Sequence, residues 1–431
     1  FFLIIALALW IVIAIFGLVI AIIFAKFPQS VLAVWGEIPL AIAMGYFVLK
    51  GRWGLVVSTL FFVGLMYVLV GMGVIFPFSI GEWFGIPATG IWTIILLVYA
   101  YIASVLPVSL LLQPRDYLNA WQLYVALGLI VLGILVAGFK IDFVMVAPAF
   151  NFQPEGAPSF WPFLFITIAC GAVSGFHSLV CSGTTSKQIA SESDAQLVGY
   201  GSMLIEGFLA IVVIIAVAAG IGIAYQSGSG EVLTGLKAWL AHYGSWQASS
   251  GLGSKLDAVV VGCSNIMTFL GIPITFGFAI VGVFIASFAG TTLDSATRIQ
   301  RYVLSELFER SSYCKPFANK WISTFIAVFS GLLLAFSSGA GGKGALLLWP
   351  MFGSVNQLLA ALALLLISIY IKKVADNWYF LSLIPCIFMA AMTLWAVWLN
   401  QLSFLKTSSF LLIGLNGVIF LLSFWIMMEG F

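Results

Sequence analysis

The sequence has very little charge. Only 7% of its 431 residues are Asp, Glu, Lys or Arg, and 63% are hydrophobic, whereas soluble domains carry about 25% charged residues. A chain with so few charges cannot cover itself with a surface compatible with water, which excludes a soluble globular protein. The net charge of +2 is also too small to indicate a nucleic-acid partner.

Motifs of enzymes and of ATP-driven pumps are missing as well. The five cysteines form no CxxC pair, so we expect them to act as small apolar side chains. No GxxxxGK[ST] loop is present, which argues against a self-contained ATP-driven pump. Ser174 and His177 lie close in sequence, but no third group is placed to orient a catalytic base. We therefore predict that the protein is not an enzyme and uses no cofactor.

Long apolar runs, in contrast, are abundant. They are hydrophobic throughout rather than alternating, which is typical of membrane helices and not of membrane β-strands. With about 20 residues needed for each span, we predict an all-α polytopic membrane protein with about twelve spans. They lie near 1–25, 34–49, 54–75, 91–112, 121–139, 161–183, 197–224, 271–293, 321–338, 346–371, 378–399 and 408–428.

The distribution of Lys and Arg predicts the orientation. Every second connection between the predicted spans is richer in Lys and Arg than the others, and the segment between Arg298 and Lys320 is the richest. Basic loops favour the cytoplasm, so this set of connections is predicted to be cytoplasmic. Residues 226–270 then form an extracytoplasmic loop. Apolar residues recur within it at helical spacing, which predicts an amphipathic helix on the outer face or an external gate. These residues are Val232, Leu236, Trp239, Leu240 and Tyr243.

The span 161–183 carries a polar stripe. Residues at steps of three and four share one helical face: Thr167, Cys170, Ser174, His177, Ser178, Cys181 and Thr185. A polar stripe must face other helices or a water-filled cavity. It could line a transport path or simply mediate helix packing, and the titratable His177, the only histidine in a predicted span, favours the first reading.

Three other polar features lie in or beside spans. Pro107 interrupts an apolar run one turn after Ser104, which predicts a kinked or broken helix of the kind found at transporter substrate sites. Glu206 lies about 15 Å into its span, where it must be neutral, paired or hydrated. Asp294 is expected to form a helix-end ion pair with Arg298. Arg115 and Asp116, at the expected cytoplasmic boundary, are predicted to pair or to cap a helix end.

Four long segments resemble one known family. They are Leu106–Leu118, Pro162–Ile189, Thr292–Tyr302 and Leu348–Leu364, and they are similar to the carbon starvation protein A family, CstA. The resemblance implies a bacterial or archaeal inner-membrane transporter for peptides or pyruvate, used in carbon starvation. It also implies a LeuT/APC-like core with a five-plus-five inverted repeat.

Members of this family usually begin with further spans, including a Gly-Pro-rich broken core helix. We therefore expect the N-terminal core helices to be missing from this sequence. The first predicted span then corresponds to core helix three, the span of Pro107 to core helix six and the polar stripe to core helix eight. On this basis 1–431 forms one transmembrane transporter domain, N-terminally incomplete, in a lipid bilayer.

The resemblance and the polar pattern together predict the functional residues. Substrate contacts are expected from Tyr101, Ser104, Pro107, Ser174 and Ser178. Coupling or gating is expected from His177, Ser182, Thr184, Thr185, Glu206 and Asp294. Hydroxyl groups could bind Na⁺, whereas His177 or Glu206 could carry a proton, so both coupling ions stay open. The predicted function is secondary-active symport of peptides or a small carboxylate such as pyruvate, and a passive channel for small solutes is the alternative.

Overall fold

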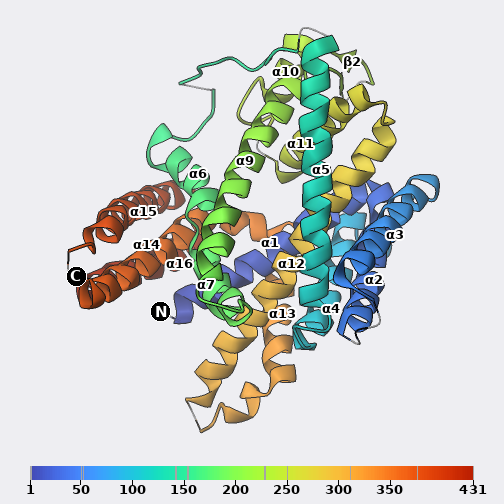
Figure 1. Cartoon of the computed structure of the whole chain (residues 1–431). Helices are drawn as coiled ribbons and strands as arrows, with labels where there is room; N and C mark the ends of the chain where they lie inside the picture. The colour runs from blue at the N-terminus through green and yellow to red at the C-terminus, as the bar shows by residue number, and fades with distance from the viewer. Residues whose placement is uncertain are drawn as a thin grey trace. The chain divides into compact units, whose positions relative to one another are not determined.

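The computed structural model consists almost entirely of helices (Figure 1). It describes residues 2–49, 51, 53–140, 143–152, 155–227, 230–249, 251–310, 312–375 and 377–430. In this part of the chain, 10 helices are long and apolar enough to cross a membrane. Two shorter apolar helices, Lys320–Phe336 and Phe410–Trp425, lie where the ninth and twelfth spans were predicted. The all-α polytopic membrane class is confirmed, and the number of spans stays a prediction.

The helices gather into two compact units. Unit 1 is built from Phe1–Ile15, Pro158–Gln196 and Ser295–Phe431, and unit 2 from Phe16–Ala157 and Leu197–Asp294. Two long helices, α1 (Phe2–Lys26) and α12 (Ile274–Glu309), contribute residues to both units. The single transporter domain expected from the sequence stays a prediction.

Unit 2 is organised around the longest helix that lies wholly within it, α5. Apolar segments become helices here because every backbone polar group in a bilayer must be satisfied within its own segment. Helix α2 packs against α3 and α5, and α11 packs against α5 and η5. The elements are η1 (Pro28–Ser30), α2 (Val31–Leu49), α3 (Leu55–Ile75), α4 (Ala88–Val105), α5 (Leu112–Lys140), η4 (Leu197–Gly201), α9 (Ser202–Ile215), η5 (Ala216–Gly220), β1 (Tyr225–Gln226), β2 (Val232–Leu233), α10 (Gly235–Tyr243), α11 (Leu252–Met267) and η6 (Thr268–Leu270).

Unit 1 is organised around α14, which runs beside α15 (Figure 1) and also contacts α6 and α7. Helix α16 packs against α15. The elements of this unit, besides parts of α1 and α12, are η2 (Phe160–Leu164), α6 (Phe165–Ala172), α7 (Gly175–Gly183), η3 (Thr185–Lys187), α8 (Asp194–Gln196), η7 (Lys315–Ala318), α13 (Lys320–Phe336), η8 (Gly344–Leu348), α14 (Trp349–Val374), α15 (Phe380–Lys406) and α16 (Phe410–Gly430).

Two segments predicted as loops are largely helical. The predicted amphipathic helix within 226–270 is α10, which starts at Gly235, so Val232 lies instead in strand β2. Much of the remaining segment forms α11, most of whose C-terminal half is buried. The basic segment after the eighth predicted span continues α12 as far as Glu309, and Arg298 and Arg301 are buried in it. Charge alone did not reveal this, because a buried arginine and a loop arginine look alike in a sequence.

The segment from β1 to α11 holds a buried histidine. His242 of α10 is 3% exposed, and its Nδ1 lies 3.0 Å from the Tyr225 hydroxyl. Its Nε2 lies 3.3 Å from the Ser254 hydroxyl. Nearby, Lys26 at the end of α1 donates to the Gly253 carbonyl and pairs with Asp257 at 3.5 Å. Burial lowers the pKa of His242 from its ordinary value of 6.5, against a smaller opposing effect of Asp257.

This histidine should make the stability of the protein depend on pH. A histidine whose pKa is lower in the folded protein binds its proton more readily in the unfolded chain. The stabilisation is therefore present above pH 6.5 and is lost as the pH falls toward the folded-state pKa. Thermal unfolding in detergent should show a smaller fall of the melting temperature at acidic pH for His242→Gln than for the wild type. Equal declines for the wild type and His242→Gln would contradict this.

Candidate functional site

The predicted polar stripe does not lie on one continuous helix. Helix α6 ends at Ala172 and α7 begins at Gly175. Between them Val173 (φ −138°, ψ 84°) and Ser174 (φ −101°, ψ 134°) have extended backbone. The helix is therefore broken at Val173 and Ser174, within the stretch that we expected to be regular.

A side chain from α14 satisfies the backbone that the break leaves free. The Asn356 Oδ1 atom accepts hydrogen bonds from the Phe176 amide at 2.8 Å and from the Ser174 hydroxyl at 3.1 Å. Its Nδ2 donates to the Cys170 sulphur at 3.2 Å. Ser174 also caps α7 by accepting from the Phe176 amide at 3.2 Å. This is the arrangement that an N-cap provides, with Asn356 as a second acceptor from another helix.

Gly175 allows the backbones of α7 and α14 to meet at this point. A Cβ atom at Gly175 would overlap the Asn356 carbonyl oxygen and the Leu359 side chain. A residue without a side chain is therefore required for this packing. The polar and small residues of this stretch thus stabilise a break in the helix, and Asn356 of α14 contributes hydrogen bonds to it.

The remaining predicted residues of this stretch lie on α7 and just after it. Ser178, Ser182 and Thr184 donate hydrogen bonds to the carbonyls of Gly175, Leu179 and Val180. His177 and Ser182 are exposed, Thr184 is buried, and Ser178 and Thr185 are half-buried. Their hydroxyls therefore largely serve the local backbone, and roles in substrate binding or coupling stay predictions.

The helix that contains Ser104 ends at Val105, where the sequence predicted a break. Leu106 is extended (φ −66°, ψ 152°), and the chain turns through Pro107 before α5 starts at Leu112. Tyr101 is half-buried, Ser104 is fully buried and Pro107 is exposed. The Ser104 hydroxyl has no hydrogen-bond partner within the described residues. Ser104 and Ser174 belong to different units, and their predicted approach across a cavity stays a prediction.

Unit 2 contains a buried cluster of three ionisable side chains. Arg115 Nη1 lies 2.9 Å from Asp294 Oδ2, and Arg115 Nε lies 3.8 Å from Glu37 Oε1. The three side chains are at most 2% exposed. They come from α5, α12 and α2, so the cluster joins three helices that are distant in the sequence.

Uncharged polar groups complete the cluster. The Tyr99 hydroxyl of α4 donates to Asp294 Oδ2 at 2.8 Å and accepts a hydrogen bond from Arg115. The Ser287 hydroxyl donates to Glu37 Oε2, which also lies 3.4 Å from Gln122 Nε2. Arg115 and Gln122 are seven residues apart, so one face of α5 supplies both groups.

Gly290 makes room for the guanidinium group. A Cβ atom there would overlap Arg115 Nη2. A small cavity of about 10 Å³ lies beside Arg115, Tyr99 and Gly290, which is the room of about one water molecule. The structure therefore leaves little room beside the cluster in this conformation.

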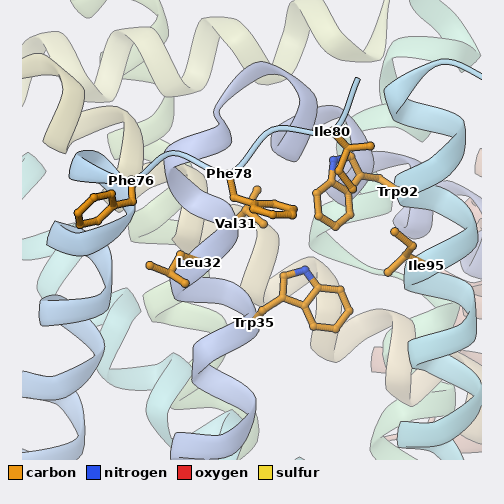
Figure 2. A pocket seen from close by; sticks show the side chains of 8 residues that line it. All are labelled: Val31, Leu32, Trp35, Phe76, Phe78, Ile80, Trp92 and Ile95. Atoms are coloured by element: carbon orange, nitrogen blue, oxygen red, sulfur yellow. The ribbon is translucent and has the colours of Figure 1, made fainter. Parts of the chain in front are cut away.

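A larger pocket lies between α2, α4 and the segment after α3 (Figure 2). Its volume is about 620 Å³ and its lining carries no charged side chain. The rings of Phe78 and Trp92 lie beside each other in it, and Trp35 closes one side. Trp35 also lines the cavity beside Arg115 and contacts the Tyr99 ring edge-on. The pocket suits apolar groups, and one aromatic ring lies between it and the charge cluster.

Several predicted interactions differ from those in the structure. Arg115 was placed at a membrane boundary with Asp116, but it is buried and pairs with Asp294 and Glu37. Asp294 forms an ion pair with Arg115 of α5, and its predicted pair with Arg298 stays a prediction. Glu206 was expected to contact another span. Its side chain is exposed on α9 and has no hydrogen bond or ion pair within the described residues.

Sequence analysis missed Glu37, although the same signal that selected Glu206 was present. Glu37 lies in the predicted span 34–49 and is the only acidic residue of that apolar run. Within the described residues, no group of three or more His, Cys, Asp or Glu side chains is placed to hold a metal ion.

Comparison with known proteins assigns the family. The model of the family described as carbon starvation protein CstA matches residues 1–396. The chain belongs to the CstA family. It is 33% identical over 441 aligned positions to the peptide transporter CstA of Mycobacterium tuberculosis, covering 90% of this chain and 56% of that protein. No solved structure matches it significantly.

Two other relatives match a similar share of the chain, and one of them carries a different name. The peptide transporter CstA of Bacillus subtilis is 31% identical, with 91% of this chain and 68% of that protein covered. The pyruvate/proton symporter BtsT of Escherichia coli is 30% identical, with 91% and 62% covered. The CstA-family chain therefore spans between about half and two thirds of the length of these relatives. It is a multi-pass membrane protein whose curated relatives are named as transporters.

Ser174 and Asn356 should stabilise the helix break together. Their contributions to the free energy of unfolding should therefore be coupled. Removing Asn356 leaves the half-buried Phe176 amide with only the longer hydrogen bond to Ser174, which costs about 1–3 kcal/mol. A double-mutant cycle of Ser174→Ala and Asn356→Ala, measured by unfolding in detergent, should give a coupling of about 0.5–3 kcal/mol. Additive effects of the two changes would show that the side chains do not act together.

Gly290 should be intolerant of even a small side chain. Gly290→Ala is expected to displace the Arg115 guanidinium and lower the free energy of unfolding by about 1–3 kcal/mol. Gly17→Ala is the matched control, because a Cβ atom at this buried glycine would make only ordinary contacts of 3.8 Å or more. Equal thermal stability of the two variants would contradict the packing of Gly290 against Arg115.

Proposed function

We propose that the protein is a secondary-active, cation-coupled symporter for peptides or small carboxylates such as pyruvate. The observation that carries the proposal is the cluster of Glu37, Arg115 and Asp294, buried among apolar helices. Ionisable groups inside a membrane protein are expensive and commonly accompany ion or substrate pathways. The names of the relatives, peptide transporter CstA and pyruvate/proton symporter BtsT, support the two substrate classes.

The broken helix in unit 1 supports the same proposal. Interrupted helices, whose free backbone groups face substrate or ions, are typical of secondary transporters. We propose a LeuT/APC-like core in which Ser174 and Ser178 contact substrate together with Tyr101, Ser104 and Pro107. In the same proposal coupling or gating involves Asp294, with further contributions from His177, Ser182, Thr184, Thr185 and Glu206. The membrane is proposed to be the inner membrane of a bacterium or archaeon.

The closed character of the cluster favours a carrier over a passive channel. A channel needs a continuous polar path, whereas the cavity beside Arg115 is only about 10 Å³. In a carrier such a group is exposed to each side in turn by a change of conformation. A cation that binds to the cluster would then move only together with that change.

Transport into proteoliposomes tests the proposal. Labelled pyruvate and a labelled dipeptide are supplied separately, under an inward proton gradient or an inward sodium gradient. We expect at least one substrate to accumulate above its external concentration under one gradient, and an ionophore that removes the gradient should abolish the accumulation. Entry of a substrate only to equilibrium, independent of both gradients, would favour the channel, and no entry of either substrate would contradict both readings.

A further inference from the structure

We propose that Glu37 carries the coupling ion of this transporter and that this ion is a proton. The inference rests on the proposed function, because it assigns one step of the symport to one residue. Glu37 is a fully buried carboxyl on α2. Neither the family match nor the names of the relatives points to it.

The charges of the cluster do not balance. Two carboxyl groups, Glu37 and Asp294, lie against one guanidinium group, that of Arg115. If all three were ionised, one negative charge would be left in excess among side chains that are at most 2% exposed. An unpaired buried charge is strongly unfavourable. The closed conformation therefore requires one further positive charge, bound to one of the two carboxyl groups.

The contacts of the two carboxyl groups identify which one is left over. Asp294 Oδ2 accepts from Arg115 at 2.9 Å and from the Tyr99 hydroxyl at 2.8 Å, and such charge-assisted hydrogen bonds are the strong ones. The Arg115 Nε atom is 3.8 Å from Glu37 Oε1, which is too long for a hydrogen bond. The guanidinium thus neutralises Asp294, and Glu37 is the carboxyl that needs another charge.

A proton fits this position better than a metal cation. The open oxygen of Glu37, Oε1, is the one that faces Arg115. A cation bound there would lie a few ångströms from the guanidinium, and two like charges at 4 Å repel by about 4 kcal/mol at an effective dielectric constant of 20. A proton avoids this repulsion, because it bonds to the oxygen and leaves a neutral group.

The surroundings offer a partner for a protonated Glu37. Asn119 Oδ1 and Gln122 Oε1, both on the α5 face that carries Arg115, are buried acceptors without a hydrogen-bond partner in the described part of the chain. The other ionisable groups near Glu37 are Arg115, Asp294 and Tyr99, together with Asp116, which follows Arg115 on α5. On α12 the buried Arg298 lies one turn beyond Asp294. Among the neighbouring helices, α1 has no ionisable residue before Lys26.

Helix α3 contributes only the phenol of Tyr67 as an ionisable group. The charge on Glu37 is therefore governed by α4, α5 and α12. When the carrier opens and Glu37 meets water, the carboxyl can release its proton, and closure again requires that a proton be bound. This links proton movement to the change of conformation.

The decisive experiment compares proton movement with substrate exchange in proteoliposomes that contain a pH-sensitive dye. Exchange of labelled for unlabelled substrate, without any gradient, reports transport alone. Addition of external substrate reports the protons that enter with it. We expect Glu37→Gln, a neutral isostere, to keep substrate exchange and to lose substrate-driven proton entry down to the level of empty liposomes. Glu231→Gln, an exposed carboxyl in the segment between β1 and β2, should retain both activities.

The outcomes separate the two proposals. If the wild type shows no substrate exchange, the proposed function fails. If the wild type exchanges substrate and Glu37→Gln still drives proton entry at the wild-type rate, the role of Glu37 fails and the function stands. Loss of proton entry in Glu206→Gln but not in Glu37→Gln would place the proton on α9 and overturn the assignment.

A second variant keeps the test informative if Glu37→Gln does not fold. Ser287→Ala removes a hydrogen bond that stabilises the ionised form of Glu37. The pH at which proton-driven uptake is half-maximal should therefore move upward, because protonation becomes easier. An unchanged pH profile in folded Ser287→Ala would contradict the inference.

Discussion

The burial of Arg115 between two carboxyl groups is the interaction on which unit 2 depends. A guanidinium group does not lose its charge in a protein, so its burial obliges neighbouring helices to supply acceptors. Asp294 comes from α12, Glu37 from α2 and the Tyr99 hydroxyl from α4. Removing one partner of such a buried pair costs about 3–5 kcal/mol. The cluster thus fixes the packing of four helices while leaving one carboxyl without a full counter-charge.

The broken helix of unit 1 follows the same physical rule with uncharged groups. Backbone amides freed inside a membrane protein need acceptors, because lipid provides none. Asn356 supplies one for Phe176, and Gly175 brings α7 close enough to α14 for that contact. In both units a polar group that looks out of place in an apolar run is matched by a group from a distant helix.

The sequence predicted the fold class well and the site only in part. Continuous apolar runs determine that spans exist, since a helix of such residues is stable only in a bilayer or a core. The break at Ser174 was not predicted, because no proline marks it and its stabilising partner lies 182 residues away. Glu37 and Arg115 were not predicted as site residues because their role depends on their contact in the folded protein. A single sequence without aligned relatives does not show which distant residues are in contact.

A proton held on Glu37 in the closed protein should be visible by infrared spectroscopy of the protein in bilayers. The difference spectrum between the wild type and Glu37→Gln should contain, at neutral pH, the C=O stretch of a protonated carboxylic acid. This band should shift in D₂O and be absent from the variant. A difference spectrum that shows only an ionised carboxylate at neutral pH would mean that Glu37 does not hold the proton.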